Sequence, residues 1–297
     1  MPINDNLVLY YKMDETTGTT TVLNSGNVVY PGQLFNNTIP SMATVGQVNG
    51  AFEFDGVNDY VNFYGIAALP PSLAWGWNWS VSMWIRTTNN DGATKALLSH
   101  GDWIGGASFF LLTFDGGGYE DGVRAFLKQG GTNLNISGSS LDISDGNWHH
   151  IVVTRSIPTE NSADTTTLSL YVDNVFIDSA SGTGYSDIID SEQEHVLGAT
   201  VTTSRNRYLN APAAFDDVRI YQDKVLTLAE IEELYEYEDP ILCWNYTARY
   251  KNSRRVFQKR GGGSYPKELK VPSSVDKSTG QMLDEGKLID PKNYNII

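Results

Sequence analysis

The stretch Trp79–Arg86, which reads WSVSMWIR, alternates apolar and polar residues along its length. Because successive side chains of a β-strand point to opposite faces of its sheet, such alternation is typical of a strand with one buried face. Similar short runs recur along the chain between turn-forming residues, from Leu7–Met13 to Ala214–Tyr221. Many short strands separated by turns predict an all-β protein built as an antiparallel β-sandwich.

Two local signals refine this prediction. Asp173 and Asn174 separate two apolar runs, and because both residue types tolerate a positive φ they predict a tight hairpin turn. Thr227 and Glu230 have the spacing of a capping box, and apolar residues follow them at helical intervals. We therefore expect one short C-terminal helix, over residues 228–237, that closes the sandwich.

The charge of the chain changes sharply near residue 240. Residues 1–239 hold 10 basic and 30 acidic residues, a net charge of −20, whereas residues 240–297 hold 11 and 5, a net charge of +6. Such a shift predicts a domain boundary, with the β-sandwich at 1–239 and an extended basic arm at 240–297. A disordered tail is the alternative interpretation of the arm.

Composition excludes several classes of protein. The net charge of −14 over 297 residues disfavours a general nucleic-acid-binding surface. Cys243 is the only cysteine, which excludes an internal disulfide framework and a cysteine-rich zinc site. No apolar run reaches the roughly 18 residues that a membrane span needs. The N-terminus lacks the basic and apolar regions of a secretory signal, so we expect a protein made in the cytoplasm without a signal peptide.

Seven motifs follow one another within residues 7–237. They are YYKMDETTGTTTVLNSGN (Tyr10–Asn27), FDGVNDYV (Phe54–Val61), SVSMWIR (Ser80–Arg86), GNWHHIVVTR (Gly146–Arg155), LYVDNVFID (Leu170–Asp178), FDDVRIY (Phe215–Tyr221) and LTLAEIEELY (Leu226–Tyr235). In this order and spacing they resemble the laminin-G-like, concanavalin A-like lectin family. The resemblance implies a jelly roll, in which two curved antiparallel sheets pack face to face. Members of the family are usually non-catalytic and bind glycans or proteins, so the resemblance also implies a binding or display module.

Catalytic patterns are absent from the sequence. Related glucan hydrolases carry Glu-x-Asp-x-Glu on one strand, because glycoside hydrolysis needs a pair of carboxylates, and this chain lacks that pattern. No nucleophile elbow, zinc-ligand spacing or phosphate-binding loop occurs either. The resemblance implies that His149 and His150 are structural residues. We therefore expect no enzymatic activity.

Glycan binding needs aromatic faces beside hydrogen-bonding groups. Two glycine-rich loops, at opposite ends of a predicted strand at 107–114, offer such residues, and residues 204–210 add an arginine and a tyrosine. The candidate ligand-binding residues are Asp102, Trp103, Tyr119, Asp121, Arg207 and Tyr208. The alternative for Trp103 is a plug that packs under its own loop.

The resemblance also implies a calcium site. In the related hydrolases an aspartate of the closing strand and groups of the N-terminal strand share one ion, and calcium prefers such carboxylate and carbonyl oxygens. The corresponding candidates are Asp14, Asp216 and Asp217. A turn carboxylate or a salt bridge to Arg219 is the alternative at this position.

One hypothesis explains both a surface-type binding fold without a secretory signal and a basic arm on an acidic body, namely that the protein is assembled inside a cell into a larger particle. We expect a structural or attachment component of a virion or similar assembly, which displays a jelly roll that binds a glycan or a surface protein. The arm then contacts neighbouring subunits through Trp244, Arg254, Arg255, Phe257, Lys259 and Arg260. A free-standing carbohydrate-binding lectin is the main alternative. A glucan-hydrolase-like enzyme ranks below it, as does nucleic-acid packaging by the arm, whose aromatic residues are scattered.

Overall fold

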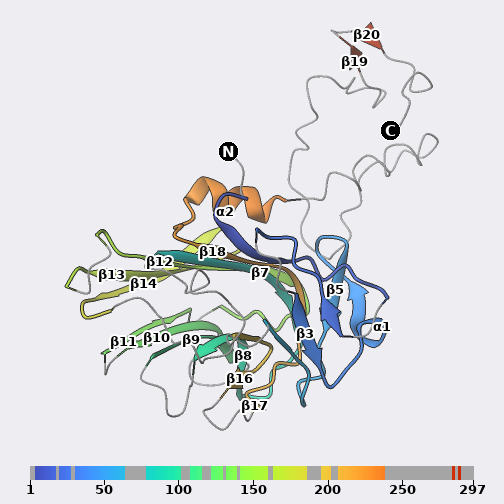
Figure 1. Cartoon of the computed structure of the whole chain (residues 1–297), viewed down its shortest axis with the longest axis horizontal. Helices are drawn as coiled ribbons and strands as arrows, with labels where there is room; N and C mark the ends of the chain where they lie inside the picture. Colours follow the sequence, from blue (N-terminus) through green and yellow to red (C-terminus); the bar gives the residue numbers. More distant parts are fainter. Residues whose placement is uncertain are drawn as a thin grey trace. The chain divides into compact units, whose positions relative to one another are not determined.

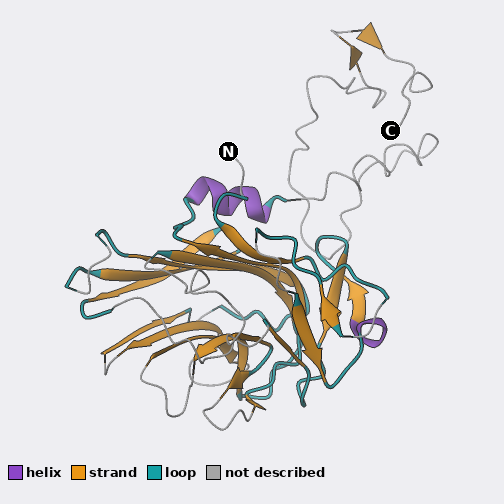
Figure 2. Ribbon diagram, in the orientation of Figure 1, coloured by secondary structure: helices purple, strands orange, loops and turns teal. Residues whose placement is uncertain are grey.

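Two antiparallel β-sheets pack face to face in the body of the protein (Figures 1 and 2). The structure is a computed structural model. It describes residues 4–17, 20–27, 31–63, 78–101, 108–115, 122–129, 132–138, 141–159, 163–185, 195–201 and 207–237, and two short strands at 283–284 and 287–288. The predicted all-β sandwich is thereby confirmed.

Sheet A has the strand order β14-β13-β12-β7-β18-β5-β4, and β1 pairs with β18 outside this path. Its strands are β1 (Leu7–Tyr11), β4 (Ala43–Val45), β5 (Gly50–Glu53), β7 (Trp79–Arg86), β12 (Trp148–Ser156), β13 (Thr166–Val172), β14 (Val175–Gly182) and β18 (Ala214–Gln222). The closing strand β18 therefore lies beside the first strand of the chain, β1, within sheet A.

Sheet B has the order β11-β10-β9-β8-β15-β6-β3-β2. Its strands are β2 (Thr21–Val22), β3 (Gly32–Phe35), β6 (Tyr60–Asn62), β8 (Thr94–Gly101), β9 (Ser108–Asp115), β10 (Gly122–Gln129), β11 (Thr132–Ser137) and β15 (His195–Leu197). A small separate hairpin is formed by β16 (Thr200–Val201) and β17 (Arg207–Tyr208).

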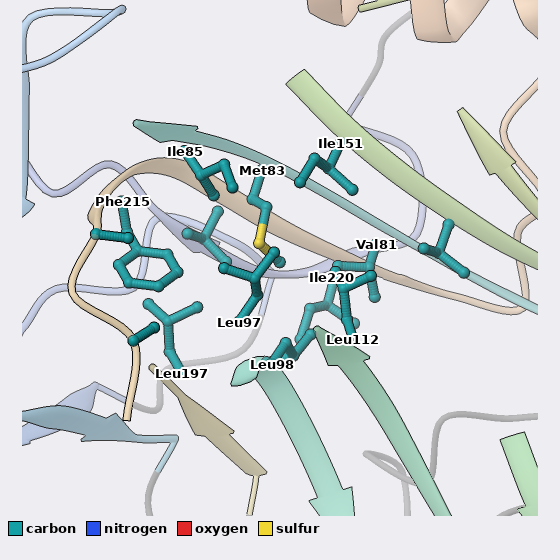
Figure 3. Close-up of a cluster of buried hydrophobic side chains, with 14 of the residues drawn as sticks. Val81, Met83, Ile85, Leu97, Leu98, Leu112, Ile151, Leu197, Phe215 and Ile220 are labelled. Carbon is teal, nitrogen blue, oxygen red and sulfur yellow. The ribbon is translucent and has the colours of Figure 1, made fainter. Parts of the chain in front are cut away.

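The main hydrophobic core fills the space between the two sheets. Val81 and Met83 of β7 face Leu98 of β8 and Leu112 of β9 across this space (Figure 3). Alternate residues of each strand supply these side chains, because only one face of a strand can point inward. The other face of each sheet points away from this core.

A helix covers the outer face of sheet A. This helix, α2 (Leu228–Tyr235), lies above β18 and β12 in Figure 1, and its Ile231 and Leu234 are buried in a second cluster with Tyr10. Trp84 is buried on this outer face rather than in the main core with Trp79, because its ring stacks on Tyr235 with 5.5 Å between centroids.

The two local signals in the sequence are confirmed. Thr227 and Glu230 form both bonds of the capping box at the start of α2. Asp173 and Asn174 both have positive φ, at 51° and 62°, and join β13 to β14. A four-residue helix, α1 (Ile39–Met42), adds to the single helix that was predicted. Among the described residues, no helix is long and apolar enough to cross a membrane.

The chain divides into two compact units, Met1–Gly262 and Gly263–Ile297. Within the second, β19 (Leu283–Asp284) and β20 (Lys287–Leu288) form a short antiparallel hairpin. The boundary predicted from charge, between residues 239 and 240, lies outside the described residues and stays a prediction.

Candidate functional site

Sheet B turns polar and aromatic side chains away from the core. On β10, alternate residues of Val123–Leu127 belong to the main core. Because the strand alternates, Arg124, Phe126 and Lys128 point to the outer face. All three side chains are half-buried, so each keeps some surface in contact with solvent.

The neighbouring strand β11 places a polar side chain opposite each of these three residues. Cross-strand pairs join Phe126 to Asn135, Lys128 to Asn133 and Arg124 to Ser137. Directly opposite residues of a sheet point to the same face. We call this surface the β10–β11 patch, and it consists of Arg124, Phe126, Lys128, Asn133, Asn135 and Ser137.

The patch continues across the sheet as one row of outward-facing residues. Strand register places them in the order Asn135, Phe126, Leu111, Ser99, Val196, Asn62 and Gln33. The middle of the row is buried, and Leu209 packs there in a small cluster with Leu111 and Phe126. The row is therefore open to solvent at its two ends rather than along its whole length.

Two hydroxyl groups flank Arg124 in the cross-strand direction. Thr113 lies opposite Arg124 on β9, and Ser137 lies opposite it on β11. Both hydroxyl oxygens are buried and have no hydrogen-bond partner in the described part of the protein. Buried polar atoms of this kind are normally bonded to protein or water, so the surroundings of Arg124 are suited to a polar occupant.

An aromatic pair lies at the other end of sheet B. Phe35 and Tyr60 are cross-strand neighbours on β3 and β6, and their rings stack with 4.8 Å between centroids and 8° between planes. Phe35 is 37% exposed. Flat rings with one open face are the surfaces on which sugar rings pack, so this pair is a second, smaller candidate contact.

Most of the ligand-binding residues predicted from the sequence lie outside the described residues. These are Asp102, Trp103, Tyr119 and Asp121, and for Arg207 of β17 only the backbone is described. Residues 102–107 connect β8 to β9 and residues 116–121 connect β9 to β10, so they leave opposite ends of β9, as expected. Tyr208 is 45% exposed and directly precedes Leu209, which packs in the small cluster with Leu111 and Phe126. The arm residues Trp244, Arg254, Arg255, Phe257, Lys259 and Arg260 are also outside the described part.

Of the three predicted calcium ligands, Asp14 and Asp216 contact the same turn, whereas Asp217 has a different partner. Asp14 accepts a hydrogen bond from Gly50 N at 2.8 Å, and Asp216 accepts one from Val48 N at 2.7 Å. Both carboxylates therefore hold the turn between β4 and β5. Asp217 instead contacts the guanidinium of Arg219 at 2.8 Å.

A β-bulge explains why neighbouring aspartates have different partners. The pairing of β18 with β7 shifts register between Asp216 and Arg219, and Asp217 has a positive φ of 53°. The extra residue of a bulge re-aims the side chains around it. Asp217 consequently turns to Arg219, which is the salt bridge considered as an alternative in the sequence. Within the described ranges, no three His, Cys, Asp or Glu residues are grouped so that they could hold a metal ion.

The chemistry of Asp14 and Asp216 nevertheless suits the binding of a cation. Burial raises the pKa of Asp216 well above its ordinary value, and the negative charges of Asp217 and Asp14 raise it further. Burial also raises the pKa of Asp14. Oδ1 of Asp216 is buried without a hydrogen-bond partner in the described structure. Calcium at this turn stays a prediction.

His149 is held between two carboxylates at the end of β12. Its Nδ1 lies 2.8 Å from Asp173 and its Nε2 lies 3.1 Å from Asp145. Burial opposes the imidazolium form, but the hydrogen bonds and charges of Asp173 and Asp145 outweigh it and raise the pKa of His149. With both ring nitrogens bonded to carboxylates, His149 has no atom left to activate a nucleophile.

His150 is bonded to a serine but is closed to solvent. Its Nε2 lies 2.8 Å from Oγ of Ser82, and both side chains are buried on the face of sheet A that α2 covers. Burial lowers the pKa of His150 to about 3. Asp173 bonds only the backbone N–H of His150, so no carboxylate orients the ring as in a catalytic triad. These two histidines are structural in the described geometry.

Sequence reasoning missed the β10–β11 patch, although its signal is present. The run 123–129 reads VRAFLKQ, in which an arginine, a phenylalanine and a lysine occupy every second position. The period of two assigns them to one face, but it does not reveal that the opposite face is the core. Nor does it reveal which strand lies alongside, because the partner is fixed by pairing in the folded sheet.

A family model matches residues 41–232. It is described as the concanavalin A-like lectin/glucanases superfamily. The match covers most of both sheets and most of helix α2. No curated protein matches the chain in sequence.

Solved structures with the same fold are mostly binding domains. One is the binding domain of Paraclostridial Mosquitocidal Protein 1, with 15% identity, a TM-score of 0.55, and coverage of 79% of this chain and 52% of that one. Another is domain 4 of AbnA, a GH43 extracellular arabinanase from Geobacillus stearothermophilus, in complex with arabinotriose, with 15% identity, a TM-score of 0.53, and coverage of 78% and 98%. A third is the binding domain of botulinum neurotoxin DC in complex with rat synaptotagmin II, with 14% identity, a TM-score of 0.52, and coverage of 79% and 52%. The chain thus spans about half the length of the toxin domains, and at this identity the likeness establishes the fold alone.

Proposed function

We propose that this chain, which belongs to the concanavalin A-like lectin/glucanases superfamily, is a non-catalytic module that binds a glycan on the outer face of sheet B. One observation carries the proposal. Phe126 lies on that face with Asn135 opposite it on β11 and with Arg124 and Lys128 on either side along β10, so hydrogen-bonding groups lie next to an aromatic ring whose other neighbour is Leu111.

The chemistry of a sugar matches these groups. The C–H face of a pyranose or furanose ring packs on an aromatic ring, while its hydroxyls exchange hydrogen bonds with amides and charged donors. Asn133 and Asn135 are exposed and offer both donors and acceptors. Trp103 and Tyr119, in connections that leave the ends of β9, are proposed as further contacts at the rim.

A protein ligand is the alternative within the same binding class. Among proteins of this fold, the arabinanase domain was solved with arabinotriose and a neurotoxin domain with synaptotagmin. The glycan is favoured for this chain because the patch combines one aromatic ring with three amide or hydroxyl side chains. Protein interfaces are instead typically centred on a cluster of large anchors in well-packed pockets.

We also propose that the chain is a component of a larger assembly, such as a virion, and that residues 240–297 are its anchor. The support is electrostatic, because the arm carries a net charge of +6 and residues 1–239 a net charge of −20. Opposite charges favour contacts between the arm of one copy and the body of a neighbour. Deletion of residues 240–297 is expected to abolish incorporation into the particle and to leave glycan binding intact. Unchanged incorporation contradicts the anchoring role.

Asp14 and Asp216 are proposed as the carboxylates of a calcium site at the turn between β4 and β5. Both already bond this turn, and the ion would neutralise two carboxylates whose pKa values burial raises. Asp217 is left out of the site because it is paired with Arg219. The ion would stabilise the folded protein and fix the position of the turn.

A glycan array probed with the full-length protein tests the proposed function. We expect saturable binding to at least one class of oligosaccharide and a loss of more than about tenfold in affinity in Phe126→Ala, since stacking and burial of a ring contribute roughly 1.5–3 kcal/mol. Phe176→Ala is the matched control, because Phe176 is 53% exposed and lies on β14 of the other sheet. The absence of glycan binding, or an equal loss in both variants, contradicts the proposal.

A further inference from the structure

Two aromatic side chains pair on the outer face of sheet A, on the two strands that follow β12 toward the edge of the sheet. Tyr171 of β13 and Phe176 of β14 are cross-strand neighbours, and their rings lie edge to face with 5.5 Å between centroids. Tyr171 packs against the apolar cluster beneath α2, whereas Phe176 is 53% exposed and Val175 beside it is 59% exposed. The apolar surface beneath the helix therefore continues to the edge strand, where it is open to solvent.

Hydroxyl groups lie on the same face as the aromatic pair. Alternate residues of β13 belong to the main core, so the residues between them point outward. Cross-strand pairs there join Ser169 to Ser179 and Thr167 to Ser181. We call this surface the β13–β14 face, and it consists of Thr167, Ser169, Tyr171, Phe176, Ser179 and Ser181.

The chain around this face is strongly acidic. Residues 141–194, which include β12, β13 and β14, hold ten acidic residues and one basic residue, Arg155, whose side chain is buried. That stretch therefore carries a net charge of −9, nearly half of the −20 of residues 1–239. Residues 228–237, which form α2 and its end, add four glutamates and no base.

Two cationic side chains of sheet A are engaged by carboxylates of their own. His149 contacts Asp173 at 2.8 Å and Asp145 at 3.1 Å, so it offsets part of the charge of those two groups. Arg86 of β7, which lies three strands from β14, contacts Glu53 at 3.7 Å. The surroundings of the β13–β14 face consequently keep an excess of negative charge.

The positive charge of the arm is concentrated in one short segment. Residues 249–260 read RYKNSRRVFQKR and hold six basic residues and no acidic residue, whereas residues 261–297 hold five of each. Val256 and Phe257 stand between the bases Arg255 and Lys259. The segment thus combines a net charge of +6 with an apolar centre, which is the complement of an exposed aromatic pair in acidic surroundings.

From this complementarity we infer that residues 249–260 of one copy of the chain bind the β13–β14 face of a second copy. Phe257 packs on Phe176 and Tyr171, while the bases on either side face the carboxylates around them. The segment starts 12 residues after Tyr237, and a stretch of that length spans up to about 40 Å, enough to reach a neighbouring copy. The inference rests on the proposed assembly role of the arm and names the surface that receives it.

Sedimentation of the full-length protein tests the inference. We expect reversible self-association at about 50 mM salt that weakens toward about 500 mM, because salt screens the attraction between charges. Phe176→Ala and Phe257→Ala are each expected to lower the association constant at least about tenfold, since truncation of an aromatic anchor removes a large share of binding energy. Phe35→Ala is the matched control, because Phe35 is 37% exposed and lies on β3 of sheet B.

A double variant shows whether the two phenylalanines form one contact. Phe176→Ala with Phe257→Ala is expected to lose little more than either single variant, because each substitution already removes the same contact. An unchanged Tm shows that each variant is folded. Losses that simply add up, or an equal loss in Phe35→Ala, overturn the inference.

Two sets of four glutamine substitutions separate the segment from the rest of the arm. The first set is expected to weaken self-association at least about tenfold and the second to leave it nearly unchanged, because only the first lies in the docking segment. The first set is Arg254→Gln, Arg255→Gln, Lys259→Gln and Arg260→Gln, and the second is Lys267→Gln, Lys270→Gln, Lys277→Gln and Lys287→Gln. Equal losses mean that net charge alone drives association, which overturns the inference.

The outcomes for the inference and for the proposed function are distinguishable. Self-association that survives Phe176→Ala but is lost on deletion of residues 240–297 overturns the β13–β14 face as the receiving surface, while the assembly role of the arm stands. A full-length protein that stays monomeric at about 50 mM salt also overturns the inference. The assembly role falls with it only if the deletion leaves incorporation into the particle unchanged, and glycan binding is measured separately on the array.

Discussion

The carboxylate of Asp216 accepts a hydrogen bond of 2.7 Å from the backbone N–H of Val48, 168 residues earlier in the chain. The contact ties the closing strand β18 to the turn between β4 and β5. Burial, and then the charges of Asp217 and Asp14, raise the pKa of Asp216 well above its ordinary value. The ionised form of Asp216 is therefore unfavourable in the folded protein unless a cation neutralises it.

Asp216→Asn is expected to stabilise the protein at neutral pH in the presence of a chelator. The folded pKa of Asp216 is above the unfolded value of about 3.9, so its stabilising contribution is present at low pH and is lost as pH rises through the folded pKa. Asparagine keeps an acceptor for Val48 N without the charge. A rise in Tm of a few degrees is expected, since about 1 kcal/mol moves Tm by roughly 2–4 °C in a domain of this size. Asp178→Asn, at an exposed site on β14, is the control.

Calcium is expected to raise the Tm of the unmodified protein and to leave that of Asp216→Asn unchanged, because binding to the folded state alone stabilises it. Differential scanning calorimetry with calcium and with chelator measures both shifts. An equal shift in the two proteins places the ion elsewhere, and the absence of a shift at millimolar calcium contradicts the site.

His149→Gln is expected to remove a pH-dependent part of the stability. Asp173 and Asp145 raise the folded pKa of His149, so its contribution is complete below the unfolded value of about 6.5 and is lost as pH rises through the raised folded pKa. The difference in free energy of unfolding between the two proteins should be about 1.5–3 kcal/mol at pH 6 and shrink toward pH 9, as hydrogen bonds to charged groups contribute roughly that much. Denaturant titrations at several pH values measure it. A difference that does not vary with pH contradicts the role of the charge.

Arg219→Met is expected to be strongly destabilising. The guanidinium is buried between the rings of Tyr10 and Tyr237, at 4.3 and 4.6 Å from their centroids, and pairs with Asp217. Removing one partner of a buried ion pair leaves an uncompensated charge, at a loss of about 3–5 kcal/mol. The double variant Asp217→Asn with Arg219→Met should recover part of that loss in urea unfolding. If the double variant is as unstable as the sum of the two single variants, the pair is not coupled.

Thr227→Ala is expected to lower stability by about 1 kcal/mol, because it removes the side-chain bond that caps the first turn of α2. Thr227→Ser keeps the hydroxyl and should retain most of the stability. The comparison is made by thermal unfolding. Since α2 covers Trp84, the intrinsic fluorescence of the alanine variant should also shift toward that of an exposed tryptophan before global unfolding.

Local elements of the fold could be predicted from the sequence because their signals lie within a few residues. The capping box of Thr227 and Glu230 is one example, and the hairpin turn at Asp173 and Asn174 is another. The face on which Trp84 is buried could not be predicted in this way, because α2 returns to it from far along the chain.

The candidate site depends on which strands pair and in which register, and the periodicity of the sequence does not reveal either. Phe126 meets Asn135 only because β10 and β11 adopt one register, and a shift of one residue would turn every side chain to the other face. The partners of Asp216 and Asp217 differ because of a bulge in β18. The resemblance to a family implied two antiparallel sheets packed face to face, but neither the strand order nor these contacts.

The central claim is that the outer face of sheet B binds a glycan at the β10–β11 patch. Backbone amide chemical shifts of the full-length protein, followed by NMR during titration with a bound oligosaccharide, test it directly. We predict that the shifts change at residues 124–128 and 133–137, and that Phe126→Ala abolishes these changes. Changes confined to the hairpin of β13 and β14, or to residues beyond 240, with the patch unaffected, would contradict the account.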